Sequence, residues 1–411
     1  MDKKIIKEKM FERLKRYVAI DTQSDPASST YPSTKTQKDF AQKLLKELKE
    51  IGVKNSFMDK YSYVFGKIDS NCGSKRKIAF IAHMDTAPAY SGKNVRVKIH
   101  RNYRGGKINI GRGVYIDEKN CPALSEHIGD DILTASGNSL LGADNKAGIA
   151  IIMTLAGYLL KNKEKIKYPN FRILFTPDEE IGKGVEKLDL KKLDAEFGYT
   201  LDGDLKGTIE KETFNADGVS IEVKGKSVHP GSAKNQMANA VRIISDIISS
   251  WPENMMPENT ENYDGFIMFD EIKGDVSYAK ASGIVREHDI KKLKYMENLL
   301  LKIAEEKRYK YPLADIKLEF KEQYRNMKEV IDKYPEVMEK LISAIKNVGI
   351  DYKIKPVRGG TDGSRLSFMG LPTPNIFTGG YNYHGPYEWI SLDSMLKSFE
   401  VSLKLLEKWT E

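Results

Sequence analysis

The feature that most constrains the fold is a helical segment that is apolar around nearly its whole circumference. Residues 145–162 read NKAGIAIIMTLAGYLLKN, and a helix with so little polar surface has to be buried. Short apolar segments typical of β-strands stand before it, at 77–85, and after it, at 171–176 and 197–202. Because strands that alternate with helices are typical of α/β proteins, we predict an α/β fold with a mixed, largely parallel sheet.

The alternation changes between residues 209 and 322. The elements expected there, in order, are a strand at 218–225, a helix at 236–251, strands at 265–272 and 276–287, a helix at 291–308 and a strand at 315–320. This β-α-β-β-α-β order forms a compact α+β unit. A chain of 411 residues is also too long for one ordinary core. We predict an α+β domain at 209–322 inserted into a larger domain made of 1–208 and 323–411.

The remaining segments are less regular. We expect a helix over residues 330–347 and a C-terminal helix from Ser391, whereas 86–131 is rich in glycine, has no clear period and is predicted to be loop. The charged N-terminus lacks the apolar region of a signal peptide, and no apolar run reaches the length of a membrane span. Two cysteines, Cys72 and Cys121, stand in unrelated contexts. A cytoplasmic protein without a membrane partner fits these observations.

The net charge of +8 raises the question of nucleic-acid binding. The lysines, however, are spread through helical segments such as 291–310 and are mixed with glutamates, as expected for solvated helix faces. The sequence contains neither a zinc-finger spacing nor an aromatic RNA-binding motif. We therefore expect no nucleic-acid partner.

Polar residues gather where the predicted strands end. His83 and Asp85 follow one strand, the run Asp178, Glu179 and Glu180 follows the next, and Asp202 ends a third. In open α/β sheets, ligands bind at this edge. Two further candidates are Asp144, just before the apolar helix, and His384, in a loop rich in glycine and tyrosine.

Each of these residues has an ordinary structural alternative. Asp144 could cap the helix, and His83 could be a hydrogen-bonded polar residue. Three adjacent carboxylates repel one another, however, and bound cations would offset that repulsion. Imidazole and carboxylate groups from several elements are typical zinc ligands, and a pair of metals needs a carboxylate that bridges them. Together the residues favour a two-metal site.

Spacing suggests separate roles for neighbouring residues. If the strand continues past His83, then Asp85 lies on the same face and can hold the second ring nitrogen of His83. Glu179 and Glu180 are adjacent and should point in different directions. One of them would then bind metal, and the other would accept a proton from water.

The chain resembles the M20 family of metallopeptidases, and within it the tripeptide aminopeptidases. The matching motifs, in order, are HMDT at 83–86, LLGADNKAG at 140–148, FTPDEEIGKG at 175–184, LDG at 201–203, VHPG at 228–231, RGGTDG at 358–363 and GLPTPN with FTGGYNYHG at 370–385. The set covers nearly the whole chain. The resemblance makes the larger domain catalytic and the inserted domain a lid.

The resemblance implies two Zn²⁺ ions per chain. The implied ligands of one are His83, Asp144 and Asp202, and those of the other are Asp144, Glu180 and His384. Asp144 would bridge the two ions. Glu179 would be the general base and Asp85 the carboxylate that orients a ligand. The family usually has aspartate where this chain has Asn145. In the family, the peptide bond between the residues at positions 144 and 145 is cis.

The resemblance also implies residues that contact the substrate. His229 in the inserted domain would stabilise the oxyanion, and Arg286 and Arg358 would bind the substrate carboxylate. The structural alternatives are a loop histidine beside a proline and two arginines in salt bridges. The implied activity is removal of the N-terminal residue from tripeptides.

Alternative activities within the family are those of a dipeptidase, a carboxypeptidase or an amidohydrolase. A binding protein on a peptidase scaffold is a different class, but no expected ligand or base is missing from the sequence. The expected partner is a small peptide substrate. The sequence does not decide whether the chain forms a homodimer.

Overall fold

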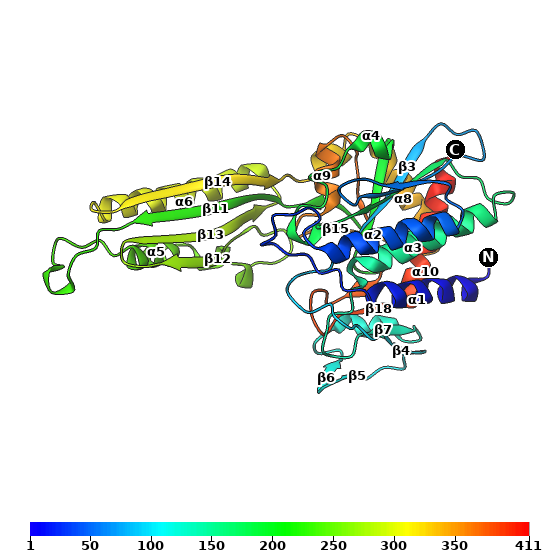
Figure 1. Cartoon of the computed structure of the whole chain (residues 1–411), viewed down its shortest axis with the longest axis horizontal. Coiled ribbons are helices and arrows are strands. Elements are labelled where there is room, and N and C mark those ends of the chain that lie inside the picture. Colours follow the sequence, from blue (N-terminus) through cyan, green and yellow to red (C-terminus); the bar gives the residue numbers. More distant parts are fainter. Residues whose placement is uncertain (411) are drawn as a thin grey trace. The chain divides into compact units, whose positions relative to one another are not determined.

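The computed structural model describes residues 1–410 and contains two compact units (Figure 1). The larger unit comprises Met1–Lys211, Glu329–Lys355 and residues 361–410, and the smaller unit comprises Glu212–Lys328 and Pro356–Gly360. The smaller unit is thus inserted in the sequence of the larger one. The domain boundaries at 208/209 and 322/323 stay a proposal. The boundaries between the two compact units lie a few residues further along the chain, after Lys211 and after Lys328. The short segment Pro356–Gly360, which contains Arg358, also belongs to the smaller unit.

An eight-stranded mixed sheet forms the centre of the larger unit. In spatial order its strands are β1 (Asn55–Met58), β2 (Val64–Ile68), β8 (Asn170–Thr176), β3 (Lys77–His83), β9 (Phe197–Gly203), β16 (Asn375–Phe377), β10 (Thr208–Thr213) and β15 (Lys353–Val357). The four central strands β8, β3, β9 and β16 run parallel, and β1, β2 and β10 pair antiparallel with their neighbours. The predicted α/β class with a mixed, largely parallel sheet is confirmed.

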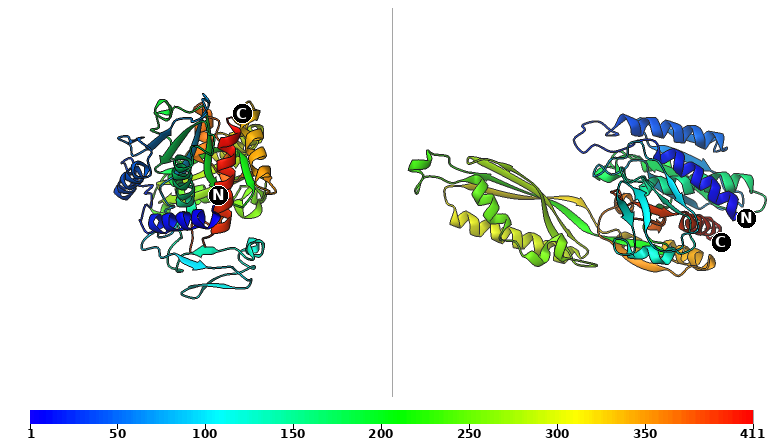
Figure 2. Two further views of the ribbon diagram at one scale, coloured as in Figure 1. Left: turned by 90° about the vertical axis from the view of Figure 1, so that its right-hand side faces the viewer. Right: turned by 90° about the horizontal axis from the view of Figure 1, so that it is seen from below.

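Helices cover both faces of this sheet (Figures 1 and 2). They are α1 (Lys3–Val18), α2 (Lys35–Glu50), α3 (Ala143–Lys161), α4 (Leu190–Leu193), α7 (Lys328–Ile331), α8 (Pro335–Asn347), α9 (Asp362–Phe368) and α10 (Leu392–Lys408). The apolar helix α3 packs against β3 and β9 on one side and against α1 and α10 on the other, which explains its lack of a polar face. Gly148 permits the close approach, because a side chain there would collide with the carbonyl oxygen of Leu201. The opposite face of the sheet is covered by a cluster that includes Val185, Leu193 and Leu366.

A smaller group of strands belongs to the larger unit. One sheet has the order β17 (Gly380–Tyr381), β18 (Trp389–Ser391), β7 (Ile132–Thr134) and β4 (Lys98–His100), and a separate pair consists of β5 (Ile108–Gly111) and β6 (Val114–Ile116). The prediction of loop for 86–131 is therefore wrong, since β4, β5, β6 and a 3₁₀ turn at Pro122–His127 lie there. Strands of three or four residues are too short to show a period.

Two further predictions require correction. The helix expected over 330–347 is two helices, α7 and α8, because Pro335 starts a new helix and disfavours helical backbone at Tyr334. The strand expected over 77–85 ends at His83, so Asp85 lies beyond β3 rather than on it.

The smaller unit has the predicted β-α-β-β-α-β order. Its elements are β11 (Asn215–Lys224), α5 (Ala240–Ile248), β12 (Phe266–Gly274), β13 (Tyr278–Glu287), α6 (Ile290–Lys310) and β14 (Asp315–Tyr324). The strands form one antiparallel sheet in the order β12-β13-β11-β14, and both helices pack on it around a core of aliphatic side chains. Helix α5 begins later than expected because Asn239 caps it.

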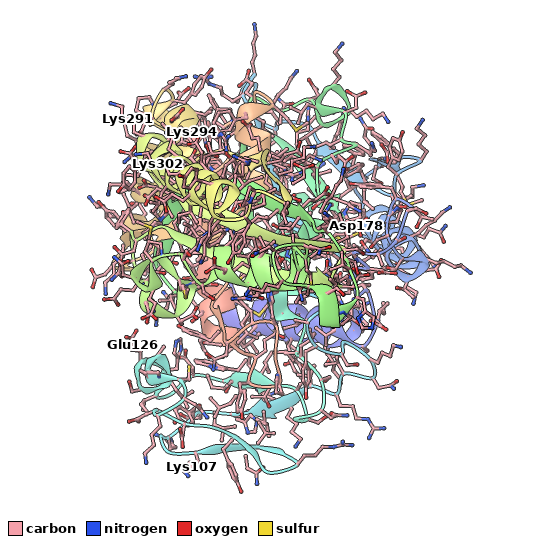
Figure 3. All side chains as sticks on the ribbon, turned by 90° about the vertical axis from the view of Figure 1, so that its left-hand side faces the viewer. Lys107, Glu126, Asp178, Lys291, Lys294 and Lys302 are labelled. Atoms are coloured by element: carbon pink, nitrogen blue, oxygen red, sulfur yellow. The ribbon has the colours of Figure 1, made fainter. Side chains whose placement is uncertain are left out.

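Most lysines of α6 lie on its exposed side, although Lys307 is buried and pairs with Asp246. Lys291, Lys294 and Lys302, which are labelled in Figure 3, point away from the core formed by Leu293 and Leu300. This is the solvated helix face that the sequence indicates. Across residues 1–410, no helix has both the length and the apolar character needed to cross a membrane.

Candidate metal centre

Three parallel strands bring the predicted ligands to one edge of the large sheet. His83 is the last residue of β3, Asp202 lies near the end of β9, and Glu180 follows β8 in a 3₁₀ turn at Glu179–Ile181. Because β8, β3 and β9 are adjacent and parallel, their carboxyl ends meet there. Asp144 comes from the start of α3, and His384 comes from the loop between β17 and β18.

The side chains form two groups that share Asp144. In one group, His83 Nε2 lies 3.0 Å from Asp144 Oδ1 and 3.5 Å from Asp202 Oδ1. In the other, His384 Nε2 lies 3.1 Å from both Asp144 Oδ2 and Glu180 Oε2. The potential ligand atoms of each group lie within 4.8 Å of one another. Asp144 therefore presents a different carboxylate oxygen to each group.

Asp85 organises the residues around the first group, although it lies beyond the strand. Its Oδ1 atom is 3.3 Å from His83 Nδ1, the ring nitrogen that faces away from the group. The same carboxylate accepts backbone hydrogen bonds from Glu179 (3.0 Å) and Glu180 (3.1 Å). Asp85 thus orients His83 and also holds the turn that carries both glutamates.

The three adjacent acids have three different surroundings. Asp178, labelled in Figure 3, is fully buried and accepts hydrogen bonds from Ser33 N (2.7 Å), the Ser33 hydroxyl and Gln37 Nε2 (2.7 Å). It attaches the turn to the start of α2. Glu180 belongs to the second ligand group, whereas Glu179 belongs to neither group found among residues 1–410. This separation explains how one strand end accommodates three carboxylates.

The backbone around Asp144 departs from a regular helix. The Asp144–Asn145 peptide bond is cis, and both residues have non-helical torsion angles. Asn145 Oδ1 accepts a hydrogen bond from Gly148 N at 3.2 Å, so Asn145 caps the regular part of α3. An aspartate at this position would offer the same acceptor, and the departure from the family pattern therefore leaves the cap in place.

Burial and mutual charge set the protonation of the cluster. Burial raises the pKa of Glu179 well above its usual range and raises that of Glu180 to about 7. Burial also raises the pKa of Asp202, and the hydrogen bonds that His384 donates to Asp144 and Glu180 raise the pKa of His384 to about 11. Hydrogen bonds from the imidazoles of His384 and His83 instead hold the pKa of Asp144 well below its usual range, so the shared carboxylate stays ionised while its acidic neighbours favour the protonated form.

These properties fit a pair of metal ions. Ligand atoms around a tetrahedral zinc lie roughly 3.3 Å apart. The distances from His83 and His384 to the carboxylates of their groups, 3.0 to 3.5 Å, are close to this value. Glu180 Oε1 is buried and has no hydrogen-bond partner among the described residues. A buried carboxylate oxygen that lacks a hydrogen-bond partner and lies among other carboxylates and imidazoles is typical of a metal ligand.

The predicted substrate residues lie in the smaller unit. His229 is exposed and precedes the 3₁₀ turn Pro230–Ser232, where its Nδ1 accepts a hydrogen bond from Gly231 N at 3.1 Å. Its Nε2 atom is on the other side of the ring. This local bond fits a loop histidine and also leaves a ring nitrogen for a substrate.

The two arginines have different surroundings. Arg358 donates to the backbone oxygens of Asn262 (3.1 Å) and Asp264 (2.8 Å) and to Thr260 Oγ1 (2.9 Å). Its guanidinium lies over two phenylalanine rings, which leaves few free N–H groups. Arg286 lies over Phe266 at 5.8 Å, and its buried Nε has no hydrogen-bond partner within residues 1–410.

The sequence did not indicate several buried residues around the centre. Ser33 lies just before α2 and Gln37 lies in its first turn, and both hold Asp178. Asp362 accepts a hydrogen bond from Thr176 Oγ1 at 2.6 Å, and burial raises its pKa to about 7. Glu388 accepts backbone hydrogen bonds from residues 141–144, which include the first two residues of α3. Only the RGGTDG motif, which contains Asp362, could have drawn attention to one of these residues.

The sheet, the inserted α+β unit and the two candidate ligand groups fit a metal-dependent hydrolase. The family model of Peptidase family M20/M25/M40 matches residues 138–408, and the chain belongs to this family.

Among curated proteins, the chain is similar to Peptidase T of Alkaliphilus oremlandii, with 43% identity over 407 residues, 98% of this chain and 99% of that protein. Peptidase T of Clostridium perfringens strain SM101 is 45% identical over 404 residues and is covered to 99%. Among solved structures, aminopeptidase PepT from Bacillus cereus has a TM-score of 0.76 at 19% identity, with 98% of this chain and 99% of that chain covered. That structure supports the fold.

Proposed function

We propose that this protein is a metal-dependent aminopeptidase that removes the N-terminal residue from tripeptides. The observation that carries the proposal is the pair of ligand groups joined by the two oxygens of Asp144. The relatives named Peptidase T support the substrate class, because their similarity extends over 98% of the chain.

The proposal assigns two Zn²⁺ ions to the larger unit. His83, Asp144 and Asp202 would hold one ion, and Asp144, Glu180 and His384 would hold the other. When bound, such a pair polarises a peptide carbonyl and lowers the pKa of a water. Asp85 keeps the imidazole of His83 in the orientation and tautomer that leave Nε2 free to ligate.

Glu179 is the proposed general base. Its carboxylate belongs to neither ligand group, yet its backbone is fixed by Asp85 beside both groups. It accepts the proton of the attacking water and then delivers this proton to the leaving amine. Bound cations would lower the pKa of Glu179 from its raised value, so that it is ionised when the water attacks.

The smaller unit is proposed to serve as the lid, with domain boundaries at 208/209 and 322/323. His229 would donate a hydrogen bond to the oxyanion, and Arg286 and Arg358 would bind the C-terminal carboxylate of the tripeptide. Of the two arginines, Arg286 has the freer guanidinium. A cytoplasmic location completes the proposal.

A panel of peptides tests the proposed activity. We expect free tripeptides to be cleaved after the first residue and N-acetylated tripeptides to be resistant, with dipeptides and tetrapeptides cleaved much more slowly. Cleavage of N-blocked peptides from their C-terminus would instead identify a carboxypeptidase. Preference for dipeptides, or for an acylated amino acid, would identify a dipeptidase or an amidohydrolase.

A further inference from the structure

Glu388 is a buried carboxylate outside both ligand groups, and it contacts four consecutive backbone amides. Its Oε2 atom accepts hydrogen bonds from Leu141 N (2.7 Å) and Gly142 N (2.8 Å), and its Oε1 atom accepts from Ala143 N (2.7 Å) and Asp144 N (3.2 Å). The side chain is 1% exposed. One carboxylate thus accepts the backbone N–H groups of all four residues 141–144, called the Asp144 turn below, where α3 begins.

The turn needs this partner. Leu141 and Ala143 are buried, and a buried backbone N–H without an acceptor is costly. Four N–H groups that point at one place also create a positive potential, which an anionic oxygen pair matches better than a neutral group. The interaction therefore holds the turn in one conformation, and Asp144 is the last residue of that turn.

The same residue is connected to His384. Glu388 follows His384 by four residues, and its amide donates to the oxygen of Gly385 at 3.2 Å. The next residue, Trp389, is fully buried in β18, pairs with Thr134 of β7 and stacks on Tyr381 with ring centroids 4.1 Å apart. The backbone of Glu388 is therefore fixed by the sheet.

These contacts converge on the second ligand group. Asp144 and His384 are 240 residues apart in sequence, and their side chains meet at 3.1 Å. Within residues 1–410, Glu388 bonds the backbone of the first and belongs to the loop of the second. We propose that Glu388 is a positioning residue that clamps the Asp144 turn to the His384 loop and so builds the second metal site.

The inference rests on the proposed metal centre, and it predicts a selective defect. In Glu388→Gln, an NH₂ group replaces one oxygen and faces amide donors, so part of the clamp is lost without a change in size. Loss of a group that orients metal ligands typically weakens metal binding about 10- to 100-fold. We expect that loss for the second zinc equivalent, whose site uses both Asp144 and the His384 loop, and a smaller loss for the first equivalent, whose site shares only Asp144 with the clamp.

The matched control is Glu400→Gln. Glu400 of α10 is also buried in the larger unit, but its partners are two lysines, Lys3 of α1 and Lys397 of α10. The metal-free full-length proteins are titrated with Zn²⁺ against a chelator, and the Co²⁺ forms are compared by visible absorption. Two tight equivalents in the wild type and in Glu400→Gln, with a weakened second equivalent and an altered cobalt spectrum in Glu388→Gln, would support the clamp.

Other outcomes separate the two ideas. A wild-type protein that binds no zinc contradicts the proposed function. A wild type with two sites and a Glu388→Gln variant within about threefold of it overturns the clamp alone. An equal loss in both variants also overturns it, because the effect would then be general.

If the Glu388→Gln variant does not fold, a measurement on the wild-type protein still tests the clamp. Hydrogen exchange of the amides of residues 141–144 should be at least about 100-fold slower than that of the exposed loop amides at Gly105 and Gly106, with and without metal. Fast exchange at 141–144 in the metal-free protein would overturn the clamp.

Discussion

The larger and the smaller unit hold their candidate site residues in different ways. In the larger unit, the candidate ligands lie at adjacent strand ends, and their orientation is set by further buried side chains such as Asp85 and Asp178. In the smaller unit, His229 is exposed and has only a local hydrogen bond, and the Nε of Arg286 has no partner among the described residues. The comparison indicates that the fold of the larger unit fixes the positions of its candidate metal ligands, whereas His229 and Arg286 of the smaller unit keep polar atoms that have no partner among the described residues.

The largest effect should come from removing metal, because the proposed activity depends on the metal ions that the fixed ligands of the larger unit would bind. Dialysis against a chelator should abolish tripeptide hydrolysis, and Zn²⁺, Co²⁺ or Mn²⁺ should restore it. Initial rates before and after re-addition measure this. Full activity in a preparation shown to be metal-free would contradict the whole assignment.

Within the larger unit, Glu179 and Glu180 allow a proposed general base to be compared with a proposed metal ligand. Glu179→Gln should lower kcat by about 10²- to 10⁴-fold, the usual contribution of a general acid–base group, and should keep both metals. Glu180→Ala should lose metal at the second site, because its carboxylate contacts His384 there. Metal counting on the purified variants distinguishes the two roles, and the reverse pattern would exchange them.

His229 tests whether the smaller unit contributes to chemistry. If it donates to the oxyanion, His229→Ala should lower kcat by about 10²- to 10³-fold, and kcat/KM should fall in parallel with no change in metal content. Ser232→Ala, a nearby exposed position in the same turn, is the control. Near-normal kcat in His229→Ala would return His229 to the role of a loop residue.

The arginines should have smaller and separable effects. Arg286→Ala should weaken the binding of free tripeptides roughly 10- to 150-fold, the range expected for a hydrogen bond to a charged group, and should spare C-terminally amidated peptides. Arg358→Ala should weaken that binding less and should also lower the melting temperature, since three hydrogen bonds attach Arg358 to residues 260–264. Steady-state kinetics on paired free and amidated peptides, with thermal unfolding of both variants, measure the difference. An equal discrimination in both variants would assign both arginines to the carboxylate.

The comparison also shows what the sequence can predict. Residues such as His83 and Asp202 stand at the ends of apolar runs, and parallel strands bring such ends together, so their proximity follows from local patterns. The hydrogen bonds of Gln37 to Asp178 and of Glu388 to the Asp144 turn join segments more than 100 residues apart. No local pattern signals these pairs. The short strands of 86–131 were missed because their stability comes from neighbouring strands and from Trp389 and Tyr381.

The smallest effect is expected at Asn145, where this chain departs from the family pattern. Its side-chain oxygen caps α3 through Gly148 N, while its side-chain nitrogen is buried without a hydrogen-bond partner among residues 1–410. Asn145→Asp keeps the acceptor and loses no hydrogen bond, so kcat/KM of the metal-loaded protein should stay within about threefold, as aspartate and asparagine cap helices equally well.

Asn145→Ala is the matched comparison, because it removes the acceptor. Loss of a cap typically costs about 1 kcal/mol of stability, so the alanine variant should melt a few degrees lower while the aspartate variant melts close to the wild type. Metal content and thermal unfolding of both variants provide the measurement. If Asn145→Asp lost metal while Asn145→Ala kept it, the added charge beside Asp144 would be what the centre excludes, and asparagine would be a requirement of this chain's metal site rather than an interchangeable cap.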